Sequence, residues 1–279
     1  MYLNRTKQKG ENMAVNDLKK KRRRAPGWVR ILAGAAYHEA KYIKGLPKVK
    51  GDLVKYEALN KRKSFSYRRK YHWFIDESSE SAGTTSSYYW QDLWAASKII
   101  ENRPDIHYDI GSRIDGFISH LQAAKIRTNL IDIRPLNNKL PYVGFTQADA
   151  TSLNGIPDNS IQSISALCSL EHFGLGRYGD PVDPEACFKA FRSIQRVLNR
   201  GGHCYISVPI GREHVEFNAH RIFYAQTIVD AFSDCELTEF SCNTLDKEMK
   251  LLRVKNVHQF DNEMDNRGDR FGLFLFVKK

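Results

Sequence analysis

The chain has 279 residues, of which 42% are hydrophobic and 27% are charged, the balance of an ordinary globular protein. This length accommodates one large α/β domain together with an appendage. No stretch approaches the roughly 20 apolar residues that a membrane-spanning helix requires, and the first residues lack the apolar core of a secretory signal. These features argue against a membrane-spanning or secreted protein and predict a cytoplasmic location.

The net charge of +11 is concentrated in the first quarter of the chain. Residues 1–70 hold 21 Lys and Arg against 5 Asp and Glu, whereas residues 71–279 hold 22 against 27. We therefore expect a basic extension and linker over residues 1–87, partly helical or disordered, and a slightly acidic domain over residues 88–279. The extension is expected to meet an anionic membrane surface, at the inner face of the membrane, or a partner protein, or to be a solvated arm. Its basic clusters are residues 19–24, 61–63 and 68–70.

The cysteines show no CxxC spacing and no histidine at the spacing of a metal ligand. An odd number of cysteines spread over the domain predicts reduced thiols, without a disulfide framework and without a metal site. The five are Cys168, Cys187, Cys204, Cys235 and Cys242.

Apolar runs and helical patterns alternate through the second part of the chain. This alternation predicts a parallel sheet with helices on both faces. No helical pattern separates the last two strands, so the last strand is expected to be an antiparallel addition at the edge. We expect strands at 106–110, 129–133, 144–150, 161–167, 203–208, 236–241 and 271–277, and helices at 88–102, 117–125, 184–198 and 219–232.

A glycine-containing turn joins the first strand to its helix, where α/β sheets bind nucleotide-like ligands. Interpreted as a dinucleotide fingerprint, the turn is Gly111-x-Arg113-x-x-Gly116, with arginine at the second glycine position. That glycine lets a pyrophosphate approach the backbone, so the arginine disfavours an NAD or FAD site. Asp115 is the expected N-cap of the following helix.

The start of the same turn, Asp109-x-Gly111, resembles the D-x-G-x-G-x-G loop of class I S-adenosylmethionine (SAM)-dependent methyltransferases. Asp132 and Asp149-Ala150 match the acidic positions that this family places beside the ribose and the adenine. The runs LNGIPDNSIQSISALCSLEH and FKAFRSIQRVLNRGGHCYISVP resemble the segments that lead into its fourth and fifth strands. Five ordered motifs thus cover about residues 105–210.

The resemblance implies a Rossmann-like class I methyltransferase fold: a mostly parallel, seven-stranded sheet with an antiparallel last strand. It also implies SAM as the cofactor. The implied cofactor-binding residues are Asp109, Gly111, Ser112, Arg113, Gly116, Asp132, Asp149, Ala150, Ser169 and Glu171. More narrowly, stretches such as DIGSRIDGF and LEHFGLGRYGDPVDP resemble a bacterial family of unknown function, whose genes often lie among those for surface-polysaccharide synthesis.

The turn departs from the methyltransferase pattern at two glycine positions, now Arg113 and Asp115. One hypothesis is that the planar guanidinium of Arg113 pairs with the methionyl carboxylate of SAM. The opposing hypothesis is that its side chain fills the pocket, so that the domain does not bind SAM.

Two loops that follow the fourth and fifth strands are rich in functional groups. Transfer of a methyl group to a hydroxyl requires a base near the acceptor proton, and His172 and His220 titrate in the useful range. The opposing interpretations are a strand-capping role for His172 and hydrogen bonds to nearby carbonyls for His220. The expected substrate-binding residues are Arg177, Tyr178, Asn218 and Arg221, whose guanidinium groups suit an acidic sugar or a phosphate.

These features favour a SAM-dependent methyltransferase for a small-molecule or glycan-linked acceptor in polysaccharide synthesis, with oxygen as the expected target. A nucleic-acid methyltransferase that clamps its substrate with the basic arm is an alternative. Against it, the basic clusters lie outside the domain and no (D/N)-P-P-(Y/F) motif follows the fourth strand. A non-catalytic scaffold with this fold, in a polysaccharide assembly complex, is a further alternative.

Overall fold

The computed structural model describes residues 27–62, 86–246, 249–263 and 270–279. The chain divides into two compact units, Met1–Gly83 and Thr84–Lys279. In the first unit, the described element is helix α2, Gly27–Leu59, with Pro47 inside it. The predicted basic clusters at 19–24 and 68–70 lie outside the described residues.

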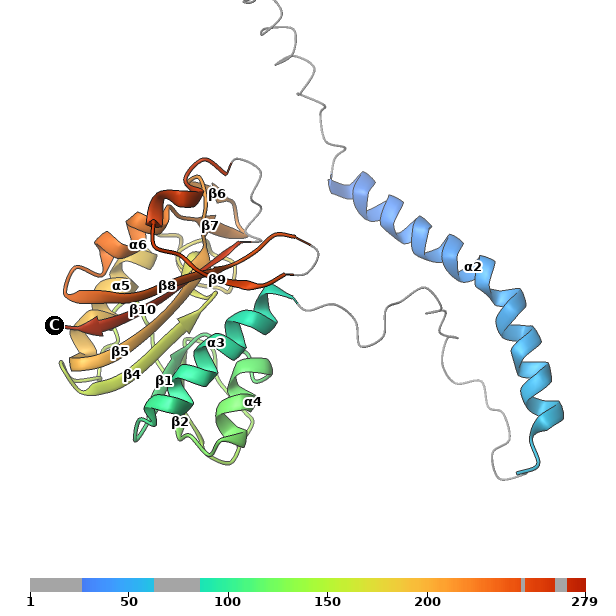
Figure 1. Ribbon diagram of the computed structural model, residues 1–279, viewed down its shortest axis with the longest axis horizontal. Helices are drawn as coiled ribbons and strands as arrows, with labels where there is room; N and C mark the ends of the chain where they lie inside the picture. The colour runs from blue at the N-terminus through green and yellow to red at the C-terminus, as the bar shows by residue number, and fades with distance from the viewer. Residues whose placement is uncertain (1–26, 63–85, 247–248, 264–269) are drawn as a thin grey trace, which may run out of the picture. The chain divides into compact units, whose positions relative to one another are not determined.

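The second unit is built on an eight-stranded sheet in the order β3-β2-β1-β4-β5-β10-β8-β9 (Figure 1). The first five strands in that order are parallel, whereas β10 is antiparallel to both of its neighbours and β9 is antiparallel to β8. This arrangement confirms the predicted Rossmann-like α/β class. The strands are β1 His107–Ile110, β2 Thr128–Asp132, β3 Val143–Gln147, β4 Ile161–Leu167, β5 Leu198–Pro209, β8 Cys235–Asn243, β9 Leu251–Arg253 and β10 Phe271–Lys278.

Helices cover both faces of the sheet, as the alternating pattern predicts (Figure 1). Helices α3 (Ser87–Asn102) and α4 (Gly116–Ala123) pack in one buried cluster, and α5 (Ala186–Val197) and α6 (Ala225–Ala231) in another. Strand β10 contributes to both, because successive side chains of a strand point to opposite faces. Its Leu273 lies in the α3–α4 cluster and its Phe274 in the α5–α6 cluster.

The sheet differs from the sequence prediction at its last strand. Strand β10 lies between β5 and β8 instead of at the edge, and the short β9 makes an eighth strand. The sequence FGLFLFVK is an almost continuous apolar run, which is typical of a strand buried on both faces. Strand β9 has only three residues, too few for a recognisable alternation.

The predicted helix at 219–232 is shorter than expected. Its first residues form β7, His220–Ile222, which pairs in an antiparallel hairpin with β6, His214–Glu216. Helix α6 begins only after Tyr224, which takes the N-cap position. Asp115 also takes its expected N-cap position, but its side chain makes no capping hydrogen bond.

All five cysteines are free, and four of them are buried. Among the described residues, no helix combines the length and the apolar character that crossing a bilayer demands.

Candidate functional site

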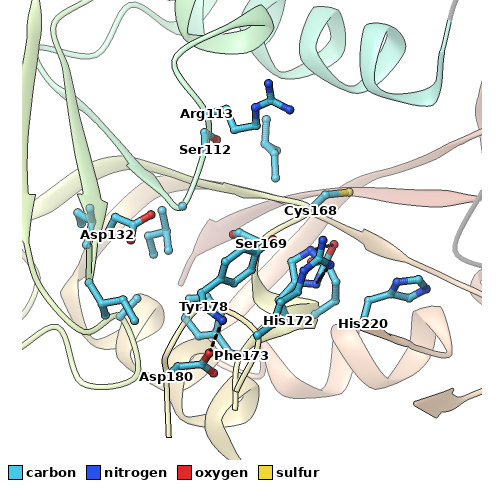
Figure 2. Close-up of a pocket in the computed structure, with 18 of the residues that line it drawn as sticks. Ser112, Arg113, Asp132, Cys168, Ser169, His172, Phe173, Tyr178, Asp180 and His220 are labelled. Carbon is cyan, nitrogen blue, oxygen red and sulfur yellow. Dashed lines mark hydrogen bonds and ion pairs between the residues drawn. The ribbon is translucent and has the colours of Figure 1, made fainter. Parts of the chain in front are cut away.

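A cavity of about 1070 Å³ lies at the carboxyl ends of β1, β2 and β4 and is bordered by α3. Figure 2 shows Ser112 and Arg113 on one side of this space, with Asp132, Tyr178 and His172 around it. The volume is at the upper end of small-molecule sites, which run from roughly 300 to 1,000 Å³. It therefore has room for a cofactor together with an acceptor.

The turn after β1 is held from below by a buried carboxylate. Asp109 is fully buried and accepts hydrogen bonds from the Ser165 hydroxyl (2.5 Å) and from the Ser112 backbone N–H (3.3 Å). Ser165 in turn contacts His107 Nε2 at 2.8 Å, and His107 Nδ1 contacts the Ser163 hydroxyl at 2.8 Å. Burial raises the pKa of Asp109 to about 6. Asp109 does not line the cavity and holds the turn in place, so its direct contact with a cofactor stays a prediction.

Two glycines allow the turn to pack closely. Gly111 has φ +77°, and a Cβ built on it would lie 2.9 Å from the Cβ of Ser169. Gly116 has φ +38°, and a Cβ there would collide with the carboxylate of Asp92. Gly111 lines the cavity, whereas Gly116 lets α4 pack closely against α3, and its cofactor contact stays a prediction.

Arg113 points outward from the turn. Its side chain is 87% exposed, and its guanidinium contacts Asp115 at 2.9 Å. A side chain so exposed does not fill the cavity, although Arg113 borders it together with Ser112. The structure therefore disagrees with the hypothesis that Arg113 blocks the pocket.

At the end of β2, Asp132 is already engaged by Arg134. The guanidinium donates from Nε to Oδ1 at 3.0 Å and from the terminal nitrogen to Oδ2 at 2.7 Å. Burial alone would raise the pKa of Asp132, but the hydrogen bonds from Arg134 lower it below its usual value. Arg134 also lies over the ring of Tyr178, 4.8 Å from its centroid.

Asp149 and Ala150 line the cavity beyond β3. The Asp149 carboxylate accepts a hydrogen bond from the Thr151 N–H at 2.8 Å. The carbonyl of Ala150 accepts one from the buried Ser193 hydroxyl at 2.5 Å. These bonds shape the turn after β3 and fix the Asp149 carboxylate within it.

The segment after β4 carries an acid–base pair. Glu171 is only 2% exposed, burial raises its pKa to about 8, and its Oε2 has no hydrogen-bond partner among the described residues. His172 Nδ1 lies 2.6 Å from the carbonyl oxygen of Ala219, so this nitrogen carries the proton, since a carbonyl only accepts. His172 Nε2 is then unprotonated and lies 3.6 Å from Glu171 Oε1. Burial lowers the pKa of His172 to about 4.

Two further buried polar atoms at this end of the cavity have no partner among the described residues: Ser169 Oγ and His220 Nε2. The rings of His220 and His172 are 6.4 Å apart. The structure thus brings together both predicted catalytic histidines with Ser169 and Glu171.

The loop over residues 173–184 forms a further wall of the cavity. Its Arg177 and Tyr178 are exposed and border the cavity, and Asp180 accepts hydrogen bonds from the backbone N–H groups of Gly174 (2.7 Å) and Tyr178 (3.1 Å). The Arg177 guanidinium lies 5.1 Å from the centroid of the Tyr178 ring. The loop therefore holds its own shape through backbone hydrogen bonds.

Arg221 and Asn218 are not substrate-facing. Arg221 is buried and donates to the backbone carbonyls of Glu171, Phe173 and Pro184 at 3.4, 2.5 and 3.3 Å. Asn218 is exposed in the hairpin turn and does not line the cavity. The predicted role of Arg221 is corrected to anchoring the 173–184 loop, and that of Asn218 has no support in its position.

The sequence prediction missed the contribution of α3. Tyr88, Gln91 and Asp92 line the cavity, and burial raises the pKa of Asp92. Gln91 Oε1 accepts hydrogen bonds from Ser207 Oγ (2.7 Å) and Cys168 Sγ (2.9 Å). The available signal was a polar pair, Gln91-Asp92, inside a helix whose neighbouring positions are apolar. Arg134 was also missed.

A family model described as "Caenorhabditis protein of unknown function, DUF268" matches residues 154–267. Comparison with curated proteins found no match. The solved structures to which the chain is similar include three proteins at sequence identities of 13 to 15%. The 1,6-didemethyltoxoflavin-N1-methyltransferase of Burkholderia thailandensis, bound to S-adenosylhomocysteine, is 15% identical over 68% of this chain and 78% of its own, with a TM-score of 0.46. The N-methyltransferase NodS of Bradyrhizobium japonicum is 13% identical over 68% and 85%, with a TM-score of 0.45. The [4+2]-cyclase SpnF is 15% identical over 67% and 81%, with a TM-score of 0.45.

Proposed function

We propose that the chain is a SAM-dependent methyltransferase that acts on a hydroxyl of a small-molecule or glycan-linked acceptor. The observation that carries the proposal is that three buried polar atoms beside the same cavity have no hydrogen-bond partner within the described part of the chain. Ser169 Oγ, Glu171 Oε2 and His220 Nε2 have no partner among the described residues and belong to residues that line this cavity. Buried polar groups are almost always hydrogen-bonded, so three such atoms in one cavity favour a bound polar molecule.

The residues at the carboxyl ends of the strands fit SAM. Gly111 leaves no room for a Cβ, so a ligand at this turn meets backbone directly. Asp132 and Asp149 offer acceptors for the ribose hydroxyls and the adenine amine. Both carboxylate oxygens of Asp132 already accept hydrogen bonds from Arg134. A bound ribose must therefore share these oxygens with Arg134 or displace its guanidinium.

When bound, SAM supplies an electrophilic methyl group; the chain must orient the acceptor and take its proton. His172 suits the second task because its Nδ1–H is fixed on the Ala219 carbonyl and its Nε2 carries the free lone pair. Burial lowers the pKa of His172 to about 4, below the range expected from the sequence, so the imidazole is unprotonated at neutral pH but is a weaker base than an exposed histidine. Glu171, with a pKa of about 8, is mostly protonated there, so its carboxyl can donate a hydrogen bond to a bound polar group.

The exposed face of the 173–184 loop suits an acceptor with polar groups. Arg177 and Tyr178 border the cavity together, and a guanidinium beside an aromatic ring offers both hydrogen bonds and a flat surface. These groups fit a sugar that carries an acidic substituent. A place in surface-polysaccharide synthesis is proposed on the sequence resemblance alone.

A calorimetric titration of the whole chain with SAM and with S-adenosylhomocysteine tests the proposal. We expect binding of both ligands, and loss of binding in Asp132→Ala. Asp105→Ala is the matched control, because Asp105 is an exposed acid outside the cavity. Failure of the unmodified chain to bind either ligand would overturn the proposal and favour the scaffold alternative.

A further inference from the structure

Helix α2 carries exposed apolar side chains that the function proposed above does not use. Leu32, Ile43 and Val54 are 60%, 62% and 66% exposed. They are spaced by eleven residues, about three helical turns, so they lie almost on one line along the helix. Leu46 and Leu53 are half-buried and lie beside that line, about 40–100° around the helix. These five residues form what we call the apolar stripe.

The side of the helix away from the apolar stripe is mostly basic, although Asp52 also lies there, 3.9 Å from the Lys55 ammonium. Lys44 and Lys55 are exposed and lie roughly 80–140° beyond the line of Leu32, Ile43 and Val54. Residues 27–62 hold eight Lys and Arg and three Asp and Glu, a net charge of +5. A helix with one apolar and one basic side is the arrangement that lies in the interface of an anionic bilayer.

We propose that α2 is a membrane-surface helix that binds the anionic face of a lipid bilayer, lying in its interface without crossing it. The lysines complement the negative potential of the lipid headgroups, and the apolar stripe enters the boundary of the acyl chains. Three charged residues interrupt the apolar side of the helix: Glu39, Glu57 and the exposed Lys50, which lies in line with Leu32. The apolar contacts are therefore insufficient alone, so binding depends on anionic lipid and is reversed by salt.

Nucleic acid fits the same surface less well. Phosphate backbones recruit Lys and Arg but offer nothing to a line of aliphatic side chains such as Leu32, Ile43 and Val54. Exposed large apolar side chains that recur along one helix mark an interaction surface, and the adjoining positive charge selects an anionic, apolar partner. A lipid bilayer has both properties.

The test is sedimentation of the full-length chain with vesicles. We expect binding to vesicles of equal parts phosphatidylcholine and phosphatidylglycerol, at least about tenfold weaker binding to phosphatidylcholine alone, and release by about 0.5 M sodium chloride. The triple variant Leu32→Ser, Ile43→Ser, Val54→Ser should weaken partitioning about tenfold, and so should Lys44→Glu with Lys55→Glu.

The matched control is Ala33→Ser, Ala40→Ser, Ala58→Ser, which makes three exposed substitutions on α2 outside the apolar stripe. It should bind within about twofold of the unmodified chain, because it lowers helix propensity without removing large apolar side chains. Circular dichroism with vesicles shows whether each variant keeps its helix.

Three results would overturn the inference: equal binding to both vesicle types, no sedimentation with either, or an unaffected triple variant. Retention on RNA that survives in the triple variant, with no vesicle binding, would assign α2 to nucleic acid instead. These α2 variants should bind SAM with the same affinity as the unmodified chain. Loss of vesicle binding with normal SAM binding therefore separates a failure of the membrane inference from a failure of the proposed methyltransferase activity.

Discussion

The two ends of the cavity differ in whether their polar side chains have partners within the chain. At the ends of β1 to β3, the charged side chains have partners within the chain: Arg113 with Asp115, and Arg134 with Asp132. At the other end, Ser169 Oγ and Glu171 Oε2 after β4 and His220 Nε2 on β7 are buried without partners among the described residues. A ligand at the first end must exchange existing bonds, whereas a ligand at the second end completes missing ones. The second end is therefore where bound groups gain most and where chemistry is expected.

The largest effect on this difference between the two ends is expected from removing His172, the proposed base. His172→Ala should lower methyl transfer from SAM by about 10²–10⁴-fold while SAM affinity stays within about twofold, because His172 acts on the acceptor proton. Transfer of a labelled methyl group to an acceptor that the unmodified chain turns over measures the first quantity, and calorimetry the second. His258→Ala, an exposed histidine on Asp261, is the control. Equal loss of both quantities would contradict the assignment.

The turn after β1 gives the next largest effect. Gly111→Ala should weaken SAM binding by at least about tenfold, because its Cβ would lie 2.9 Å from Ser169 and displace the turn. Gly155→Ala is the matched control: Gly155 also has positive φ, +87°, but nothing lies within 4 Å of its Cβ position. Both variants should lose stability by about 1 kcal/mol in chemical denaturation, from backbone strain. Similar SAM affinity in the two variants would show that the turn is not the cofactor site.

Burial of Glu171 at the second end should make the free energy of unfolding depend on pH. Its pKa is raised from 4.5 to about 8 in the folded chain, so the folded state holds a proton that the unfolded state releases between these values. The stabilisation is fully present below about pH 4.5 and is lost as the pH rises toward 8. Glu171→Gln should remove this decline, measured as the free energy of unfolding by urea at several pH values. An identical pH dependence in both chains would place the Glu171 carboxyl in water instead of a buried site.

The smallest effect is expected at the paired end. Arg134→Ala frees the Asp132 carboxylate, so SAM affinity should rise by about threefold, the scale of a partly exposed ion pair. The gain should vanish in the background of Asp132→Asn, because it acts through that carboxylate. Weaker binding in Arg134→Ala would instead make Arg134 a ligand-binding residue.

The sequence predicted the elements that local patterns encode. Ile161–Leu167 was placed to the residue, because seven mostly apolar residues follow the turn signal IPDNS. The position of β10 inside the sheet was not predicted, since strand order depends on which distant segments pair. Its two-sided burial was nevertheless visible in the run FGLFLFVK.

Within the candidate site, residues that follow strands were predicted and residues that act across the fold were not. Asp132 and Asp149 follow β2 and β3, and their place at the cavity comes from topology alone. Arg221 was predicted to bind the substrate because a guanidinium suits an acidic sugar or a phosphate. Its actual partners are three carbonyls 37 to 50 residues away in sequence, and no local pattern reports them.

The buried chain His107–Ser165–Asp109 has a consequence for how the site tolerates change. Each member satisfies the next, so replacing one leaves a buried polar group unpaired at a cost of about 1–3 kcal/mol, whereas replacing both partners with apolar groups of similar shape can be nearly neutral. Single substitutions beneath the turn are thus penalised and concerted ones are not. We therefore expect related sequences either to keep all three residues of this hydrogen-bonded series or to replace them together.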